Sequence, residues 1–162
     1  MTDIHPTAFV SQHADIETSS RGTRFIVGAH SMIDSFVKVK MTGGDGDIVI
    51  GERCYINSGS VIYSGNGMSI GNNVLIAANC TLAPVNHEFR DQSRTIRDQG
   101  FAKSRGGILI EDDVWIGANC VILDGAIIRR GSVVGACSLV RGELEAYSIC
   151  RGVPAAQFGS RK

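Results

Sequence analysis

The chain has 162 residues, and its sixteen lysines and arginines balance sixteen aspartates and glutamates, so the formal net charge is zero. Such a neutral chain lacks the basic bias of a nucleic-acid binder, and we expect no nucleic-acid partner. Aromatic residues make up only 6% of the chain while twenty residues are glycine, which favours tight turns and aliphatic layers over a helical bundle. The length suits a single domain, residues 1–162, with its own hydrophobic core.

The cysteines and the hydropathy of the chain indicate in which cellular compartment the protein is found. The five cysteines lie among aliphatic residues, with neither a C-x-x-C pair nor interleaved histidines. This pattern predicts buried thiols in a reducing, cytoplasmic environment. The N-terminus has no basic segment followed by an apolar run, and eighteen apolar residues never occur together. We therefore expect neither an export signal nor a membrane span.

A six-residue repeat begins at the N-terminus, where Ile4, Val10 and Ile16 are six residues apart. This period fits neither an amphipathic helix nor a simple two-sided strand. A small residue often follows the aliphatic one. The later members of the repeat are Val27, Ile33, Val39, Ile50, Ile56, Ile62, Ile70, Ile76, Leu82, Ile110, Ile116, Ile122, Ile128, Val134 and Val140.

Extra residues enter the repeat only after complete sets of three hexads: five, five, two and then twenty-two, the last between Leu82 and Ile110. Three hexads therefore form one turn, as in a triangular β-solenoid whose aliphatic side chains stack from coil to coil. Six coils at a spacing of about 4.8 Å give a prism roughly 29 Å tall. We expect coils over 4–87 and 110–145, a long loop at 88–109, a short C-terminal tail over 146–162, and all insertions at one edge.

Several motifs extend this pattern: Ile4–Ala8 at the start, Pro84–Phe89, Gln99–Phe101, Ile110–Asn119, and Gly152–Ala155 at the end. On these motifs the sequence resembles the hexapeptide-repeat acyltransferases, and among them the sugar O-acetyltransferases that act on galactosides, maltose, capsule and O-antigen. The resemblance implies an all-β fold, the left-handed parallel β-helix. The left hand rests on the resemblance alone, because parallel crossovers are otherwise right-handed in about 98% of cases.

The resemblance further implies an acetyl-CoA-dependent transferase that moves an acetyl group to a hydroxyl of a sugar or glycan, in polysaccharide biosynthesis. A neutral alcohol is a poor nucleophile, so a base must remove its proton as the oxygen attacks. Imidazole titrates near neutral pH and suits this role. The resemblance assigns it to His87, and we interpret His5, His13 and His30 as structural or solvent-facing.

A base works best when a carboxylate or carbonyl fixes its tautomer through the far ring nitrogen. The candidates near His87 are Asn86, Glu88, Asp91 and Asp98. Asn86 is equally suited to bind the acceptor, and the acidic residues can instead be solvated loop charges. The sequence leaves this choice open.

Acetyl-CoA is the expected co-substrate, and the resemblance places its pantetheine arm along the last coils. The matching positions are Trp115, Gly117, Ala118, Ala136 and Arg141. Trp115 is equally suited to a subunit interface. The sequence from Arg129 to the C-terminus contains six basic residues and only two acidic ones. This excess of positive charge fits phosphate binding. Ala156 and Arg141-Gly142 depart from the family pattern at the 3′-phosphate contact, so Arg141, Arg161 and Lys162 are the candidate substitutes.

Members of this family are trimers with active sites between subunits, so we expect a homotrimer in which segment 88–109 reaches toward a neighbour. Because Ile4 already begins the first coil, we expect no counterpart of the helical N-terminal segment of the galactoside and maltose enzymes. Galactoside or maltose is therefore not assumed as the acceptor.

Other functions share the solenoid. A γ-class carbonic anhydrase needs three converging histidines, but no second histidine lies within fifty residues of His87, so we expect no metal. A non-catalytic assembly subunit would have no use for a histidine loop and a basic C-terminus. Transfer to an amino sugar or to an antibiotic remains an alternative, and the sequence does not identify the acceptor.

Overall fold

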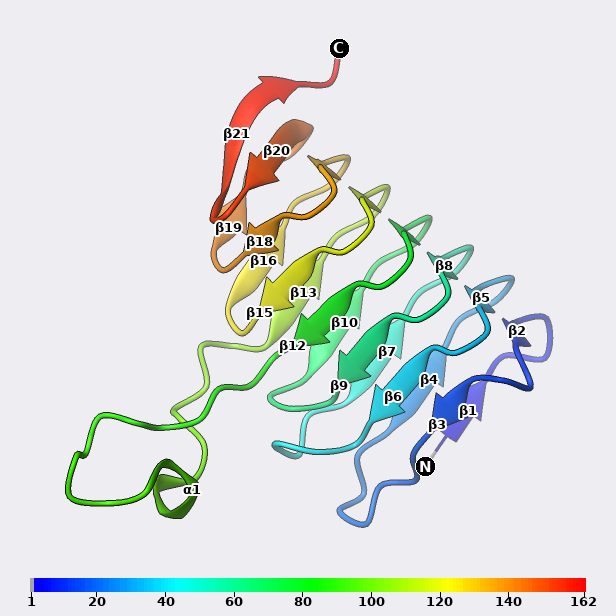
Figure 1. Ribbon diagram of the computed structural model, residues 1–162. Coiled ribbons are helices and arrows are strands. Elements are labelled where there is room, and N and C mark those ends of the chain that lie inside the picture. Colours follow the sequence, from blue (N-terminus) through cyan, green and yellow to red (C-terminus); the bar gives the residue numbers. More distant parts are fainter. Residues whose placement is uncertain (1) are drawn as a thin grey trace.

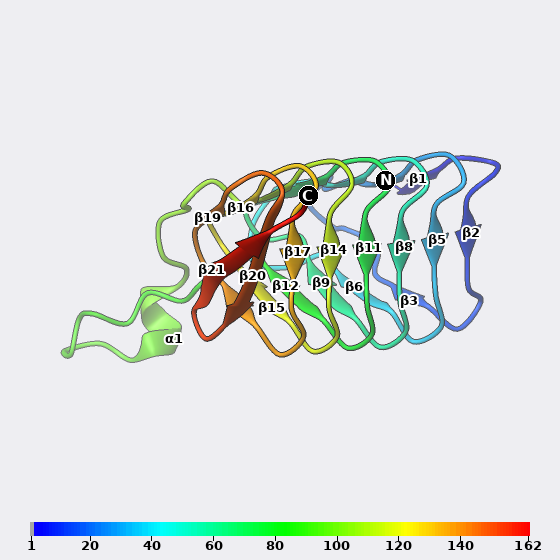
Figure 2. The same ribbon diagram turned by 90° about the horizontal axis from the view of Figure 1, so that it is seen from above.

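A computed structural model describes residues 2–162. The chain winds through three sheets in turn, and within each sheet the strands of successive coils lie parallel and in register. Figure 1 shows these strands stacked from the N-terminus to the C-terminus, and Figure 2 shows the coils side by side along the solenoid axis. The triangular solenoid predicted from the hexads is therefore confirmed.

The strands of each sheet follow the same spatial order as the coils. Sheet A contains β1 (Thr2–Ile4), β4 (Phe25–Val27), β7 (Ile48–Ile50), β10 (Met68–Ile70), β13 (Ile108–Ile110), β16 (Ala126–Ile128) and β19 (Glu143–Leu144). Sheet B contains β2 (Phe9–Val10), β5 (Met32–Ile33), β8 (Tyr55–Ile56), β11 (Leu75–Ile76), β14 (Trp115–Ile116), β17 (Val133–Val134), β20 (Ser148–Gly152) and β21 (Ala155–Ser160). Sheet C contains β3 (Asp15–Ile16), β6 (Lys38–Lys40), β9 (Val61–Tyr63), β12 (Thr81–Ala83), β15 (Val121–Leu123) and β18 (Leu139–Val140).

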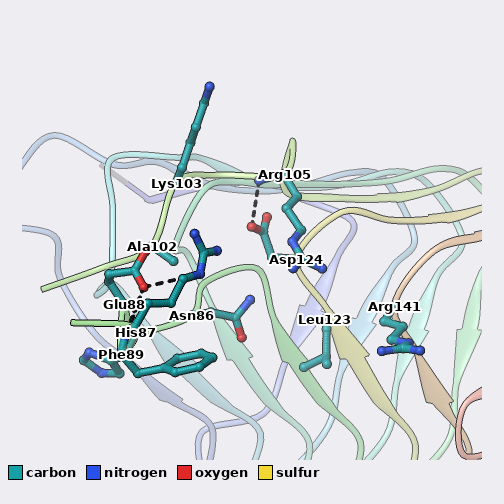
Figure 3. Close-up of a pocket in the computed structure, with 11 residues that line it drawn as sticks. Asn86, His87, Glu88, Phe89, Ala102, Lys103, Arg105, Leu123, Asp124 and Arg141 are labelled. Atoms are coloured by element: carbon teal, nitrogen blue, oxygen red, sulfur yellow. Dashed lines mark hydrogen bonds and ion pairs between the residues drawn. The ribbon is translucent and has the colours of Figure 1, made fainter. Parts of the chain in front are cut away.

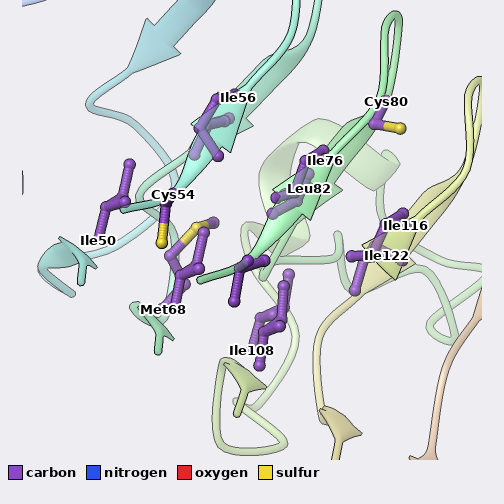
Figure 4. Packing of buried hydrophobic residues seen from close by; sticks show 14 of the residues in the cluster. Ile50, Cys54, Ile56, Met68, Ile76, Cys80, Leu82, Ile108, Ile116 and Ile122 are labelled. Carbon is purple, nitrogen blue, oxygen red and sulfur yellow. The ribbon is translucent and has the colours of Figure 1, made fainter. Parts of the chain in front are cut away.

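The aliphatic residues of the hexads fill the interior. Ile33, Ile56, Ile76 and Ile116 pair in register along sheet B, and each is completely or almost completely buried. Burying such a side chain contributes roughly 1.5–3 kcal/mol. Figure 4 shows Ile56, Ile76 and Ile116 packed with side chains of the other two sheets. Ile4 is 36% exposed, because the first coil has a neighbouring coil on one side only.

The corners of the coils require an unusual backbone conformation. Asn73, Asn79, Asp113 and Asn119 turn the chain between sheets with φ between 56° and 59°. Asparagine and aspartate visit this left-handed region more readily than other residues with a side chain. Short polar residues at the corners therefore allow three flat faces to meet within each coil.

The insertions all lie where the chain passes from sheet C to sheet A, as the sequence predicted. The longest one follows β12 and contains the short helix α1 (Ile96–Gln99). In both ribbon views this insertion projects from the coils (Figures 1 and 2). We call residues 84–107 the arm, because β13 begins at Ile108.

The C-terminal segment is more regular than the expected tail over 146–162. Strand β19 starts a seventh coil, and β20 continues sheet B by pairing with β17. Strand β21 then turns back antiparallel to β20. No helix within residues 2–162 is long and apolar enough to cross a membrane.

Candidate active site

The arm is closed at its base by pairing between its outgoing and returning segments. His87 and Phe101 form an antiparallel bridge. The Glu88 amide donates to the Gly100 carbonyl at 3.0 Å, and the Ala102 amide donates to the Asn86 carbonyl at 2.8 Å. The backbone of His87 is therefore held at the point where the arm leaves the coils.

The imidazole of His87 has a defined partner. Its Nδ1 lies 3.2 Å from the Gly100 carbonyl oxygen. A carbonyl oxygen only accepts hydrogen bonds, so this contact places the proton on Nδ1 and leaves a lone pair on Nε2. The ring also packs against Phe101, with ring centroids 5.0 Å apart. His87 is exposed to solvent, so Nε2 is accessible to an acceptor molecule.

The other orienting candidates make contacts within the arm. Hydrogen bonds from the backbone N–H groups of Arg90 and Phe89 to the Glu88 carboxylate lower its pKa. The Asp91 carboxylate accepts from the hydroxyl and amide of Ser93, which lowers its pKa. Asp98 accepts from the hydroxyl of Thr95 at 2.6 Å. These carboxylates shape the arm, and the Gly100 carbonyl is the group in contact with His87.

Sequence reasoning missed Gly100 in this role. Gln99–Phe101 carried part of the family resemblance, but a backbone carbonyl leaves no side-chain signature in a sequence. Only the fold of the arm reveals which carbonyl meets the imidazole.

A cavity of about 430 Å³ opens between the arm and the fifth and sixth coils, which contribute Leu123, Asp124 and Arg141. Figure 3 shows how its side chains come from the arm and from the edge where sheet C meets sheet A. It is lined by Asn86, His87, Glu88, Phe89, Arg90, Ala102, Lys103, Arg105, Leu123, Asp124 and Arg141. The predicted residues Asn86, His87, Glu88 and Arg141 thus come together in one place.

Asp124 anchors the returning end of the arm, and sequence reasoning missed this residue as well. Its side chain is buried, and its two carboxylate oxygens accept from the amides of Arg105 at 2.8 Å and Gly107 at 2.9 Å. The Gly125 amide also donates to the Gly107 carbonyl at 2.6 Å. An available signal was the Asp-Gly pair at the sheet C to sheet A corner, where the fifth coil has no insertion.

The predicted coenzyme residues separate into two groups around sheet C. Gly117 and Ala118 lie in the turn between β14 and β15, and Ala136 lies in the turn between β17 and β18. Arg141 follows β18, at the opposite edge of sheet C. A Cβ at position 117 would lie 2.6 Å from the Ala136 nitrogen, so glycine is required there for the coils to stack.

Trp115 and Arg161 lie on the sheet B side. Trp115 is 53% exposed on β14, and both residues line a second cavity of about 280 Å³. The Arg161 guanidinium donates to the Asp113 carboxylate at 2.9 Å and to the Gly131 carbonyl at 3.0 Å. Lys162 follows it at the exposed end of the chain. Within one chain these three residues do not join the cavity that contains His87.

Residues 2–162 contain no group of three or more histidines, cysteines, aspartates or glutamates placed to hold a metal ion. The sequence predicted buried thiols for all five cysteines, which is wrong for Cys137, because this residue lies at a corner of the coil with φ 58°. Cys54, Cys80, Cys120 and Cys150 are buried and free, while Cys137 is exposed.

Comparison with known proteins identifies the family of this fold. Residues 107–142 match the family described as bacterial transferase hexapeptide (six repeats), and residues 47–84 match the hexapeptide repeat of succinyl-transferase. The chain is 31% identical over 139 residues to the putative lipopolysaccharide biosynthesis O-acetyl transferase WbbJ of Escherichia coli K12, covering 83% of this chain and 67% of that protein. The chain belongs to the hexapeptide-repeat acyltransferase family.

The chain is also similar to a second curated protein and to a solved structure. The galactoside O-acetyltransferase of Escherichia coli K12 is 36% identical over 112 residues, which cover 67% of this chain and 51% of that protein. The solved structure of AntD, an N-acyltransferase from Bacillus cereus in complex with dTDP and 3-hydroxybutyryl-CoA, superposes with a TM-score of 0.82 at 21% identity. That superposition covers 99% of this chain and 83% of that chain.

Membership of the hexapeptide-repeat acyltransferase family bears out the predicted left-handed parallel β-helix. The chain spans only part of the first curated relatives it matches, 51% of the galactoside enzyme and 39% of a probable acetyltransferase of Mycobacterium tuberculosis.

Proposed function

We propose that this protein is an acetyl-CoA-dependent O-acetyltransferase that acts on a hydroxyl of a sugar or glycan, with His87 as general base. The observation that carries the proposal is the contact between His87 Nδ1 and the Gly100 carbonyl at 3.2 Å. In the neutral imidazole this contact leaves the lone pair on Nε2, and His87 lines a cavity large enough for a sugar. The relatives named as O-acetyltransferases support transfer to oxygen.

The proposed step is a direct transfer. His87 Nε2 takes the hydroxyl proton while the acceptor oxygen attacks the thioester carbonyl carbon. The tetrahedral intermediate then collapses, the carbon–sulfur bond breaks, and the proton held on Nε2 passes to the departing thiolate of coenzyme A. The Gly100 carbonyl stabilises the imidazolium that exists between these two proton transfers.

The coenzyme has a proposed path over the outer face of sheet C. Gly117, Ala118 and Ala136 border this face, and their small size leaves room for the pantetheine arm beside the backbone. The role of Arg161 and Lys162 at the coenzyme phosphates stays a prediction, as does the cytoplasmic location. Arg141, the third candidate for the phosphates, lines the cavity that contains His87 and is considered below.

We infer a homotrimer in which sheet B packs against a neighbouring copy. Its outer face carries an apolar column in register: Phe9, Met32, Tyr55, Leu75, Trp115, Val133 and Ile149. Phe9, Leu75 and Trp115 are about half exposed in one chain, and such a continuous apolar surface favours association. Sedimentation analysis should give a trimer, and Trp115→Glu should shift it toward monomer. A wild-type monomer would contradict this.

The test of the proposed function begins with calorimetric titration of coenzyme A and of dephospho-coenzyme A. We expect coenzyme A to bind, and its affinity to fall without the 3′-phosphate. His87→Ala should retain this binding but lose about 10²–10⁴-fold in kcat for acetyl transfer. The matched control is His13→Ala, a histidine that stacks on Phe36 far from the arm.

Two outcomes would redirect the proposal. No binding of either coenzyme would remove the transferase function and leave a structural β-helix. Acetylation of amino sugars but not of hydroxyl acceptors would instead establish N-transfer, with the same base.

A further inference from the structure

The cavity beside His87 is surrounded by positively charged side chains. Arg90 and Arg105 come from the two ends of the arm, and Arg141 follows the last strand of sheet C. Figure 3 shows the Arg105 side chain extending from the arm toward Leu123, with Arg141 beyond it. Lys103 also lines the cavity, but its side chain points away from those of Arg105 and Arg141 (Figure 3).

The two carboxylates of the cavity, Glu88 and Asp124, neutralise only part of this charge, because four basic side chains line it: Arg90, Lys103, Arg105 and Arg141. Asp124 is occupied by the backbone amides of Arg105 and Gly107. Glu88 is occupied by the amides of Phe89 and Arg90, and its nearest cation is Arg90 Nε at 3.7 Å.

Arg105 and Arg141 have no ion pair within residues 2–162. Their position contrasts with that of Arg129, which bonds both Glu111 and Glu143. Both side chains are exposed, so the cavity presents two guanidinium groups that can bind an anion.

We propose that this cavity binds an acceptor that carries a negatively charged phosphate or carboxylate group next to the hydroxyl being acetylated. The inference rests on the proposed function and specifies its substrate class. Guanidinium groups bind both oxyanions through paired, charge-assisted hydrogen bonds. Asn86, which lines the same cavity, supplies an amide for the neutral part of the acceptor.

The phosphates of the coenzyme are poor occupants of this position. In coenzyme A the pantetheine arm separates the thioester sulfur from the pyrophosphate and the 3′-phosphate. When the thioester carbon is at His87, the phosphates of the same molecule lie at the far end of that arm. Because Arg105 lines the same cavity as His87, an anion bound to it belongs to the second substrate.

The test uses calorimetry on the protein saturated with coenzyme A, so that the coenzyme site is filled. The probes are inorganic pyrophosphate, glucuronate and neutral glucose. We expect pyrophosphate or glucuronate to bind at least tenfold more tightly than glucose, and the preferred anion distinguishes a phosphate from a carboxylate acceptor. Arg105→Ala should weaken anion binding about 10–100-fold, the range for a charge-assisted hydrogen bond.

Matched variants separate this site from the coenzyme site. Arg97→Ala removes the same charge from the arm at a residue outside the cavity, and should leave anion binding unchanged. Arg105→Ala should leave the affinity for coenzyme A within twofold. Neither anion binding more tightly than glucose would overturn the inference, as would equal losses of anion and coenzyme affinity in Arg105→Ala. Failure of the proposed function would appear separately, as absent coenzyme binding in the wild type.

Discussion

In the coils after the first, side chains six residues apart are almost fully excluded from water, whereas in the arm the large apolar residues Phe89, Ile96 and Phe101 are about half exposed or more. The coils are held by a stack of aliphatic side chains that repeats from sheet to sheet. The arm is held by hydrogen bonds at its base and by one buried carboxylate from the coils. The tightly packed coils thus hold the arm in position, and the arm presents the proposed base, His87.

The coil side of this comparison predicts the largest change in stability. Ile76→Ala removes a fully buried side chain from the middle of sheet B and should lower the free energy of unfolding by about 2–5 kcal/mol. Chemical denaturation measures this loss. Ile96→Ala, on the exposed helix of the arm, is the control and should change stability by less than about 0.5 kcal/mol. Equal losses would mean that the arm is part of the cooperative core.

The junction between the two regions predicts an intermediate effect. Asp124→Ala leaves the buried amide of Gly107 without its acceptor, at a cost of about 1–3 kcal/mol, while the partly buried amide of Arg105 can bond to water instead. The loss should concentrate in the arm, as faster hydrogen exchange there, and kcat should fall with it. Asp91→Ala, which removes a carboxylate bonded only to Ser93, should have a much smaller effect. An unchanged exchange rate in Asp124→Ala would show that Asp124 does not hold the arm in place.

The arm by itself predicts the smallest effect, a dependence on pH. Folding lowers the pKa of Glu88 from its ordinary value of 4.5, because backbone amides donate to the ionised carboxylate. The unfolded arm therefore binds the proton more readily, and this stabilisation is present above pH 4.5 and lost as the pH falls through the lowered pKa. Protection of the Phe89 and Arg90 amides should decline over that window. In Glu88→Gln the decline should disappear, and its persistence would assign the effect to another group.

The sequence determined the fold because the physical requirement is periodic. Each coil must place an aliphatic residue on each of three inner faces, so the requirement appears at every sixth position and its interruptions mark the corners. His87 was predictable because the base requires a particular side chain, and because the adjoining residues match a known family. The same reasoning could not identify the carbonyl that orients it.

What only the tertiary structure decided concerns groups brought together from distant coils. Gly100 meets His87 because the arm doubles back, and Asp124 holds the arm because a corner two residues wide lies beneath its returning end. Arg141 lies with His87 while Trp115 and Arg161 lie on another face, although all were predicted for one groove. A repeat specifies which residues face inward, but the path of an insertion depends on backbone hydrogen bonds and local packing that have no period.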